Sequence, residues 1–244
     1  MPAGEGALTA SGVTVRFGAL AAVDRVDLVV RGGDILGLIG PNGAGKTTLV
    51  NAITGFERLT AGSVRLGTRT ITRTPAHKRA RLGIVRTFQS GHSFGRMTAL
   101  ENVEAAAVGT GLGRRAARRR AAELLAFVNL AHRAGVIARA LPHGDERRLE
   151  VARALAMNPR YLLLDEPAAG LDERESDELM DTIRSARDEI RCGIILIDHD
   201  MRVIMQTCER IQVLNYGRTI CVGTPNEVRS DPAVVAAYLG TRRD

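Results

Sequence analysis

The chain has 244 residues, 45% of them hydrophobic and 25% charged, which is ordinary for a globular protein with one large domain. No apolar run approaches the roughly 18 residues that span a membrane, and the N-terminus lacks the basic and apolar regions of a signal peptide. The net charge of +7 permits contact with nucleic acid or an anionic membrane, but the aromatic content of 3% argues against a single-strand binding surface.

Residues 1–89 are predicted to form a β-rich lobe. Short apolar or alternating runs, bounded by glycine and polar residues, predict strands at 8–15, 27–31, 34–39, 62–66 and 83–87. A glycine-rich loop follows the third of these strands and leads into a helix, which is expected from Thr47 to Ile53.

From about residue 90 to 155 the sequence is rich in alanine and arginine and predicts a helical subdomain. Thr98 and Glu101 have the S/T-x-x-E spacing of a capping box, which predicts a helix start at Thr98. A longer helix is expected over 114–130, and its arginines are interpreted as a solvated face rather than a phosphate or lipid-headgroup patch. The apolar stripe of this helix consists of Ala117, Ala121, Leu124 and Val128.

The last part of the chain, about 156–244, is predicted to return to the core. Strands are expected at 160–166, 194–200, 210–214 and 218–222, and helices at 172–190 and 231–239. Because strands and helices alternate around a glycine-rich loop, the predicted fold class is α/β with a mostly parallel sheet. The ligand of such a sheet binds at the carboxyl ends of its strands. We expect one domain over residues 1–244.

Residues Gly40–Thr47 match G-x-x-x-x-G-K-[ST], the pattern of a phosphate-binding P-loop. A predicted strand precedes the loop and a predicted helix follows it, as this motif requires. Glycines let backbone N–H groups surround the phosphates, and the helix N-terminus adds its positive dipole. Lys46 is predicted to bridge the β- and γ-phosphates, and the Thr47 hydroxyl to bind Mg²⁺. We therefore prefer a phosphate site to a loop that only turns the chain.

Polar residues at three strand ends complete the predicted site. Asp165 is placed to hold Mg²⁺ through its water shell, and Glu166 should point the other way and orient the attacking water. His199 could contact the γ-phosphate or Glu166, and we prefer this to a structural role. Gln89 is both donor and acceptor, so it could contact Mg²⁺ and the water.

These motifs resemble those of the ATP-binding subunits of ABC transporters, and the match runs nearly end to end. The resemblance implies a P-loop NTPase of the ABC ATPase type, with an antiparallel β subdomain and a helical subdomain beside the core sheet. It implies ATP and Mg²⁺ as cofactors, catalytic roles for Lys46, Gln89, Glu166 and His199, and metal binding by Thr47, Gln89 and Asp165. The nucleotide-binding residues that it implies are Phe17 of the A-loop, Gly40, Pro41, Asn42, Gly43, Ala44, Gly45, Lys46, Thr47 and Thr48 of the Walker A motif, Leu141 and Gly144 of the signature, and Asp172 of the D-loop.

Several stretches are similar to the branched-chain amino acid subfamily, namely residues 16–20, 85–89, 147–153, 166–170, 223–225 and the ending 237–240. This similarity implies the ATP-hydrolysing motor of an importer for branched-chain or related amino acids. The implied partners are a second, different ATPase subunit in a head-to-tail dimer, two membrane-spanning permeases that dock near Gln89 and, indirectly, a solute-binding protein. No nucleic acid partner is expected, and the implied location is the cytoplasmic face of the cell membrane, as a peripheral subunit.

Two alternative functions stay open. The ATPase could drive another cargo, such as urea, a short amide or a lipid. A soluble ABC protein that acts on ribosomes or DNA is less favoured, because this chain has one cassette and about fifty residues between Gln89 and the signature.

The signature itself departs from the common Leu-Ser-Gly-Gly-Gln, since Leu141–Asp145 reads Leu-Pro-His-Gly-Asp. Pro142 has neither a hydroxyl nor a backbone N–H, and Asp145 places an anion near the triphosphate. A helix is expected to begin near Asp145, where an acidic first turn is also favourable for the helix alone. We expect the two ATP sites of the dimer to be unequal.

Overall fold

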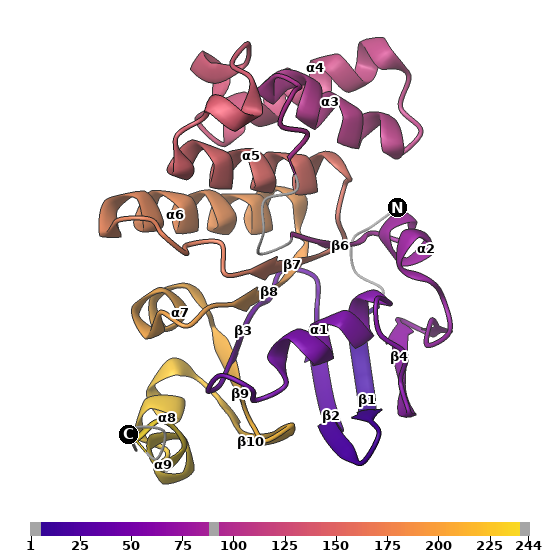
Figure 1. The fold of residues 1–244 in the computed structure, drawn as a ribbon, viewed down its shortest axis with the longest axis vertical. Coiled ribbons are helices and arrows are strands. Elements are labelled where there is room, and N and C mark those ends of the chain that lie inside the picture. The colour runs from indigo at the N-terminus through magenta and orange to yellow at the C-terminus, as the bar shows by residue number, and fades with distance from the viewer. Residues whose placement is uncertain (1–5, 88–92, 240–244) are drawn as a thin grey trace.

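The computed structural model describes residues 6–87 and 93–239, and within them a six-stranded sheet runs through the middle of the molecule (Figure 1). The strand order is β10-β9-β3-β8-β7-β6, with β10 antiparallel to β9 and the other neighbours parallel. The strands are β3 (Ile35–Ile39), β6 (Ile84–Arg86), β7 (Tyr161–Asp165), β8 (Gly193–Ile197), β9 (Arg210–Asn215) and β10 (Arg218–Gly223).

A second, antiparallel sheet lies at the lower right of Figure 1 and has the order β2-β1-β4-β5. Its strands are β1 (Leu8–Phe17), β2 (Leu20–Val30), β4 (Ala61–Leu66) and β5 (Arg69–Thr70). Helix α1 (Lys46–Thr54) packs in one apolar cluster with residues of both sheets, and its Leu49 and Ile53 are fully buried. This packing fixes the start of α1 at the carboxyl end of β3.

Three helices form a separate layer at the top of Figure 1: α3 (Ala99–Gly109), α4 (Arg114–Phe127) and α5 (His143–Ala156). The predicted capping box is confirmed, because Thr98 Oγ1 accepts a hydrogen bond from Glu101 N at 3.2 Å. The predicted stripe of α4 is also confirmed, since Ala117, Ala121, Leu124 and Val128 are buried, although the helix ends at Phe127 and Val128 is its C-cap. Two short 3₁₀ turns, η1 (Ala131–Arg133) and η2 (Ala138–Ala140), connect α4 to α5, and α6 (Glu173–Ile190) lies between this layer and the sheet.

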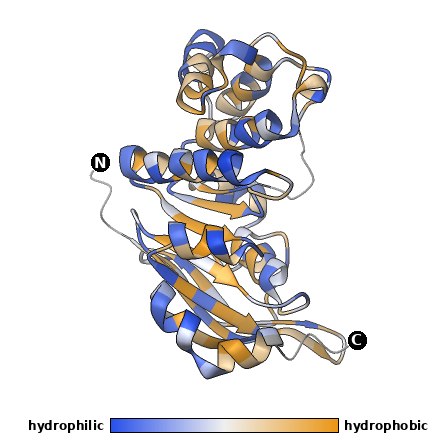
Figure 2. Cartoon of the chain, turned by 90° about the vertical axis from the view of Figure 1, so that its left-hand side faces the viewer, coloured by the Kyte–Doolittle hydropathy of each residue, from blue (hydrophilic) through white to orange (hydrophobic). Residues whose placement is uncertain are grey.

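The central strands divide the interior into two cores. On β8, Ile194 and Leu196 face the cluster that contains the helical layer, while Ile195 and Ile197 face the cluster around α1. In Figure 2 the strands in the middle of the molecule are largely orange, whereas the helices carry both hydrophilic and hydrophobic residues. A strand with both faces buried has no polar alternation, which explains why these strands appear in the sequence as unbroken apolar runs.

The predicted fold class is confirmed, but the prediction missed three short helices. These are α2 (Ala76–Arg81), α7 (Met201–Thr207) and α8 (Pro225–Ser230), whereas the C-terminal helix α9 (Pro232–Leu239) was expected. Helices of two turns or less have too few residues to show a clear period. Within the described residues, no helix is long and apolar enough to cross a membrane.

Candidate nucleotide-binding site

The P-loop joins β3 to α1 and fits closely against two other segments. A Cβ on Gly40, which has φ of 149°, would lie 2.1 Å from Leu214 O, and a Cβ on Gly45 would lie 2.4 Å from Ala22 O. Only glycine fits at either position. Gly45 caps α1 without a side-chain hydrogen bond, so the first N–H groups of the helix remain available to an anion such as phosphate.

Lys46 is the first residue of α1 and folds back over the loop. Its Nζ donates to the carbonyl oxygens of Gly40 at 2.6 Å and Pro41 at 3.1 Å. Burial lowers the pKa of the Lys46 ammonium, while the negative charges of Glu166 and Asp165 oppose this shift. The lysine and both predicted carboxylates therefore act on one another across a single site. Thr47 and Thr48 follow in the first turn of α1, where Thr47 is exposed.

Asp165 ends β7 and is held by two consecutive residues at the end of β6. Its Oδ2 lies 2.6 Å from Arg86 Nη2, and its backbone N donates to Thr87 Oγ1 at 3.3 Å. The same Arg86 guanidinium donates through Nη1 to Asn51 Oδ1 on α1. The side chains of Arg86 and Asp165 are only 7% and 5% exposed. This buried pair was not predicted, because it depends on β6 lying beside β7.

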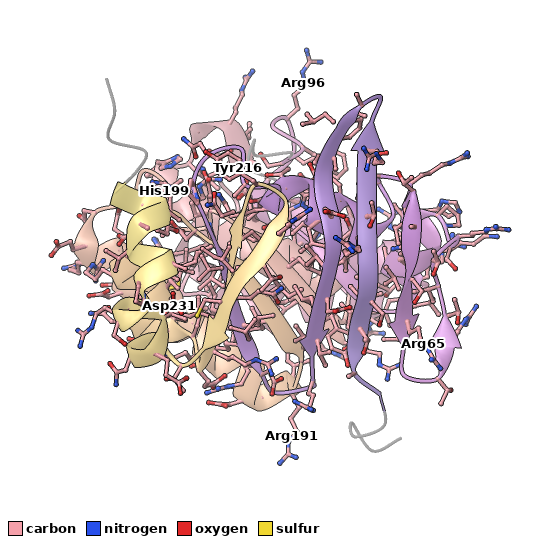
Figure 3. All side chains as sticks on the ribbon, turned by 90° about the horizontal axis from the view of Figure 1, so that it is seen from below. Arg65, Arg96, Arg191, His199, Tyr216 and Asp231 are labelled. Atoms are coloured by element: carbon pink, nitrogen blue, oxygen red, sulfur yellow. The ribbon has the colours of Figure 1, made fainter. Side chains whose placement is uncertain are left out.

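Glu166 and His199 meet beyond the ends of β7 and β8. The strand β7 stops at Asp165, and Glu166 has a left-handed φ of 50° with its N–H bonded to Ile197 O at 2.7 Å. Glu166 is therefore turned by the backbone and not, as predicted, by alternation along the strand. His199 Nδ1 lies 3.9 Å from Glu166 Oε1 and 3.6 Å from Asp198 Oδ1. In Figure 3, His199 lies at the upper left of the molecule and Arg191, which precedes β8, at the bottom.

The residues of the expected signature lie at the start of α5 and contact the segment before α6. Helix α5 begins at His143, two residues before the position expected, and Pro142 is its N-cap. His143 Nε2 lies 2.9 Å from Ala169 O. A Cβ on Gly144 would lie 2.8 Å from Glu175 Oε1, so the two helix starts approach closely there. Leu141 is half-buried and packs against the apolar cluster that contains the helical layer.

Asp172 and Asp145 each have a partner within the chain. Asp172 caps α6, because its Oδ1 accepts from Glu175 N at 2.8 Å. Asp145 forms an ion pair of 3.4 Å with Arg133. Both carboxylates thus stabilise local structure, whatever else they contact in an assembly.

The comparison with family models decides which kind of P-loop protein this is. Residues 23–169 match the ABC transporter family. The chain belongs to the ABC transporter family. The resemblance inferred from the motifs is thereby confirmed, and the chain is a nucleotide-binding protein and an ATPase. Residues 218–244 match a second model, described as branched-chain amino acid ATP-binding cassette transporter.

Individual ABC proteins resemble the chain over nearly its whole length. The high-affinity branched-chain amino acid transport ATP-binding protein BraF of Pseudomonas aeruginosa is 44% identical, over 96% of this chain and 97% of BraF. The lipopolysaccharide export system ATP-binding protein LptB of Haemophilus influenzae is 36% identical over the same shares. The crystal structure of MJ1267, an ATP-binding cassette of an ABC transporter in its ADP conformation, superimposes with a TM-score of 0.88 at 29% identity. That superposition covers 96% of this chain and 99% of MJ1267.

The predicted adenine contact of this ABC cassette, Phe17, lies in the antiparallel sheet. Phe17 ends β1 beside the turn to β2 and is 51% exposed, so it is not a core residue. Gln89 lies outside the described residues.

Two tyrosines near the P-loop were missed. Tyr216 is 84% exposed in the β9–β10 turn, and the next residue, Gly217, donates its N–H to Ala44 O at 3.0 Å (Figure 3). Tyr238 of α9 also reaches the loop, where it forms a hydrogen bond with the Gly40 backbone. Burial raises the pKa of the Tyr238 hydroxyl, and this hydrogen bond opposes the shift. The C-terminal part of the chain therefore supports the P-loop, which local sequence patterns do not show.

Proposed function

We propose that this chain is the ATP-hydrolysing motor subunit of an importer for branched-chain or related amino acids. The observation that supports the cargo best is the match of residues 218–244 to the branched-chain amino acid model, together with the similarity to BraF. The observation that supports the chemistry best is the position of Lys46 within electrostatic range of both Asp165 and Glu166.

In this proposal the P-loop holds the triphosphate of ATP. The N-terminus of α1 and the Lys46 ammonium supply positive charge, and Lys46 exchanges the carbonyls of Gly40 and Pro41 for phosphate oxygens. Phe17 stacks on the adenine ring, for which its half-exposed position is suited.

Glu166 orients and polarises the attacking water, and His199, whose Nδ1 lies 3.9 Å from Glu166 Oε1, would contact either Glu166 or the γ-phosphate. Gln89 would contact the same water. The bond from the Glu166 backbone N–H to Ile197 O fixes the turn of the main chain at this residue, so its side chain leaves the line of β7.

The residues present also fit Mg²⁺. The Thr47 hydroxyl and the Asp165 carboxylate are oxygen donors, which this cation prefers, and the negative potential felt by Lys46 would attract it. When bound with ATP, Mg²⁺ would neutralise charge that develops on the phosphates.

The proposed partners are a second ATPase subunit, most simply a different chain, and two membrane-spanning permeases, with a solute-binding protein acting through them. A cleft of about 180 Å³ between the sheet and the helical layer is the place where a permease segment would dock. Its lining is both apolar and charged and consists of Val85, Arg86, Thr87, Ala106, Glu150, Arg153, Ala154 and Met157. Thr87 in this lining is two residues before Gln89 in the chain. The subunit would then lie peripherally on the cytoplasmic face of the cell membrane.

A different cargo is the second candidate, favoured by the 36% identity to LptB. The experiment that separates the two is transport by the assembled complex in vesicles, with ATP inside and either leucine, urea or a labelled lipid as cargo. We expect ATP-dependent leucine uptake that Lys46→Ala abolishes. Transport of lipid or urea without leucine uptake would contradict the proposed cargo but not the ATPase.

A further inference from the structure

The ion pair between Arg86 and Asp165 lies where three segments of the nucleotide site meet. Arg86 is the last residue of β6, Asp165 is the last residue of β7, and Asn51 belongs to α1, the helix that the P-loop starts. One guanidinium contacts the other two side chains, at 2.6 Å to Asp165 Oδ2 and through Nη1 to Asn51 Oδ1. The rigid fork of arginine offers two separate nitrogens to the two partners in a fixed geometry, whereas a lysine ammonium is a single point charge on a flexible stem.

This pair is more deeply buried than a second pair of equal length. Arg148 Nη2 also lies 2.6 Å from a carboxylate, that of Glu178, but the Glu178 side chain is 42% exposed. Both partners of the Arg86–Asp165 pair are nearly inaccessible. A buried ion pair contributes little net stability, because desolvation offsets the attraction between the charges. Stability alone therefore gives no reason for a charged pair at the end of β7.

The geometry explains the pair in another way. The carboxylate of an aspartate can rotate about its side-chain bonds. A carboxylate that takes part in a metal site binds more effectively when neighbouring groups fix its orientation. Arg86 fixes Oδ2, while Thr87 fixes the backbone of the same residue through the 3.3 Å bond from Asp165 N. Asn51 in turn fixes Arg86 relative to α1, which carries Lys46 and Thr47.

We propose that Arg86 is a positioning residue that orients Asp165 toward the divalent cation and so sets the affinity of the nucleotide site for that cation. This inference rests on the proposed function, since it takes Asp165 as part of the Mg²⁺ site.

The test is a titration of Mn²⁺ into the full chain saturated with ATP, with bound Mn²⁺ followed by electron paramagnetic resonance. All variants carry Glu166→Gln, so that hydrolysis does not alter the nucleotide. We expect Arg86→Lys, which keeps the charge and loses the fork, to raise the half-saturating Mn²⁺ concentration by about tenfold. Asn51→Leu should raise it in the same direction by less, because Arg86 keeps its bond to Asp165.

Two controls make the result specific. Arg148→Lys changes the matched ion pair away from the site and should leave the Mn²⁺ titration unchanged, even if it lowers the melting temperature. Asp165→Asn tests the metal site itself, and an unchanged titration with that variant would contradict the proposed function. If Asp165→Asn weakens Mn²⁺ binding while Arg86→Lys leaves it unchanged or tightens it, the inference about Arg86 is wrong and the metal site stands.

Discussion

The Lys46 ammonium lies 2.6 Å from the carbonyl oxygen of Gly40, so the lysine of the P-loop is hydrogen-bonded to the loop itself. Because burial already disfavours this charge, its exchange from carbonyl to phosphate oxygens should be favourable. Lys46→Ala removes a charge-assisted hydrogen bond of about 1.5–3 kcal/mol and should weaken ATP binding by roughly ten- to a hundredfold.

Hydrolysis by the Lys46→Ala complex should fall to background, as measured by phosphate release at saturating ATP. Circular dichroism melting of the apo protein serves as the control for folding. Near-normal turnover would contradict the assignment of this loop to ATP.

Phe17 should stack on adenine. The ring is 51% exposed, so Phe17→Ala removes little apolar contact from the core. We expect loss of about 1–3 kcal/mol of ATP binding, by analogy with base stacking on aromatic residues. Calorimetric titration with ATP and with triphosphate alone measures this, because only ATP carries the adenine. A large loss of apo stability with unchanged ATP affinity would show that Phe17 is a packing residue.

The unusual signature should make one ATP site slow. At that site Pro142 offers the ATP neither the hydroxyl nor the backbone N–H of a serine, and Asp145 adds a negative charge. The ion pair with Arg133 reduces that anion's field without removing it. Restoring donors with Pro142→Ser and Asp145→Gln should raise the slow rate by about tenfold or more.

Single-turnover hydrolysis in the assembled heterodimer, with the two sites resolved by inactivating one catalytic glutamate at a time, measures both rates. If the two ATP sites hydrolyse ATP at equal rates in the heterodimer with the original signature, the predicted asymmetry is wrong. Pro142→Ser should leave the melting temperature close to that of the original protein, because Pro142 is exposed at the N-cap of α5.

Stability should depend strongly on Arg79, which is 1% exposed in α2. Its guanidinium donates to four backbone oxygens, among them Ala52 O and Thr72 O at 2.8 Å each, and so closes the end of α1. Arg79→Met leaves buried carbonyls unsatisfied and should lower the free energy of unfolding by about 3 kcal/mol. Arg81→Met, an exposed change in the same helix, should have little effect in the same urea titration. Equal small effects would show that the carbonyls find other donors.

The sequence predicted those elements whose signal is local. The unbroken apolar runs of β3, β7 and β8 follow from burial on both faces, and the strand ends then mark the position of Asp165 and His199. Helix α8 carried a usable signal that was overlooked, because Thr224 and Glu227 form a capping box.

Other features depend on the tertiary arrangement and have no local signal. Arg86 and Asp165 are brought together only because β6 lies beside β7, although more than seventy residues separate them in the chain. The left-handed backbone at Glu166 likewise depends on its bond to β8. The same reason explains why the contact of Tyr238 with Gly40 could not be predicted.

The most direct test of this account is Glu166→Gln in the complete transport complex, with ATP binding and phosphate release measured on the same preparation. Gln keeps the shape of the side chain and loses the charge that polarises water, so ATP affinity should be unchanged. Phosphate release should fall by about a hundredfold or more. If Glu166→Gln releases phosphate at the normal rate, Glu166 is not the catalytic carboxylate and the mechanism proposed for this site is wrong.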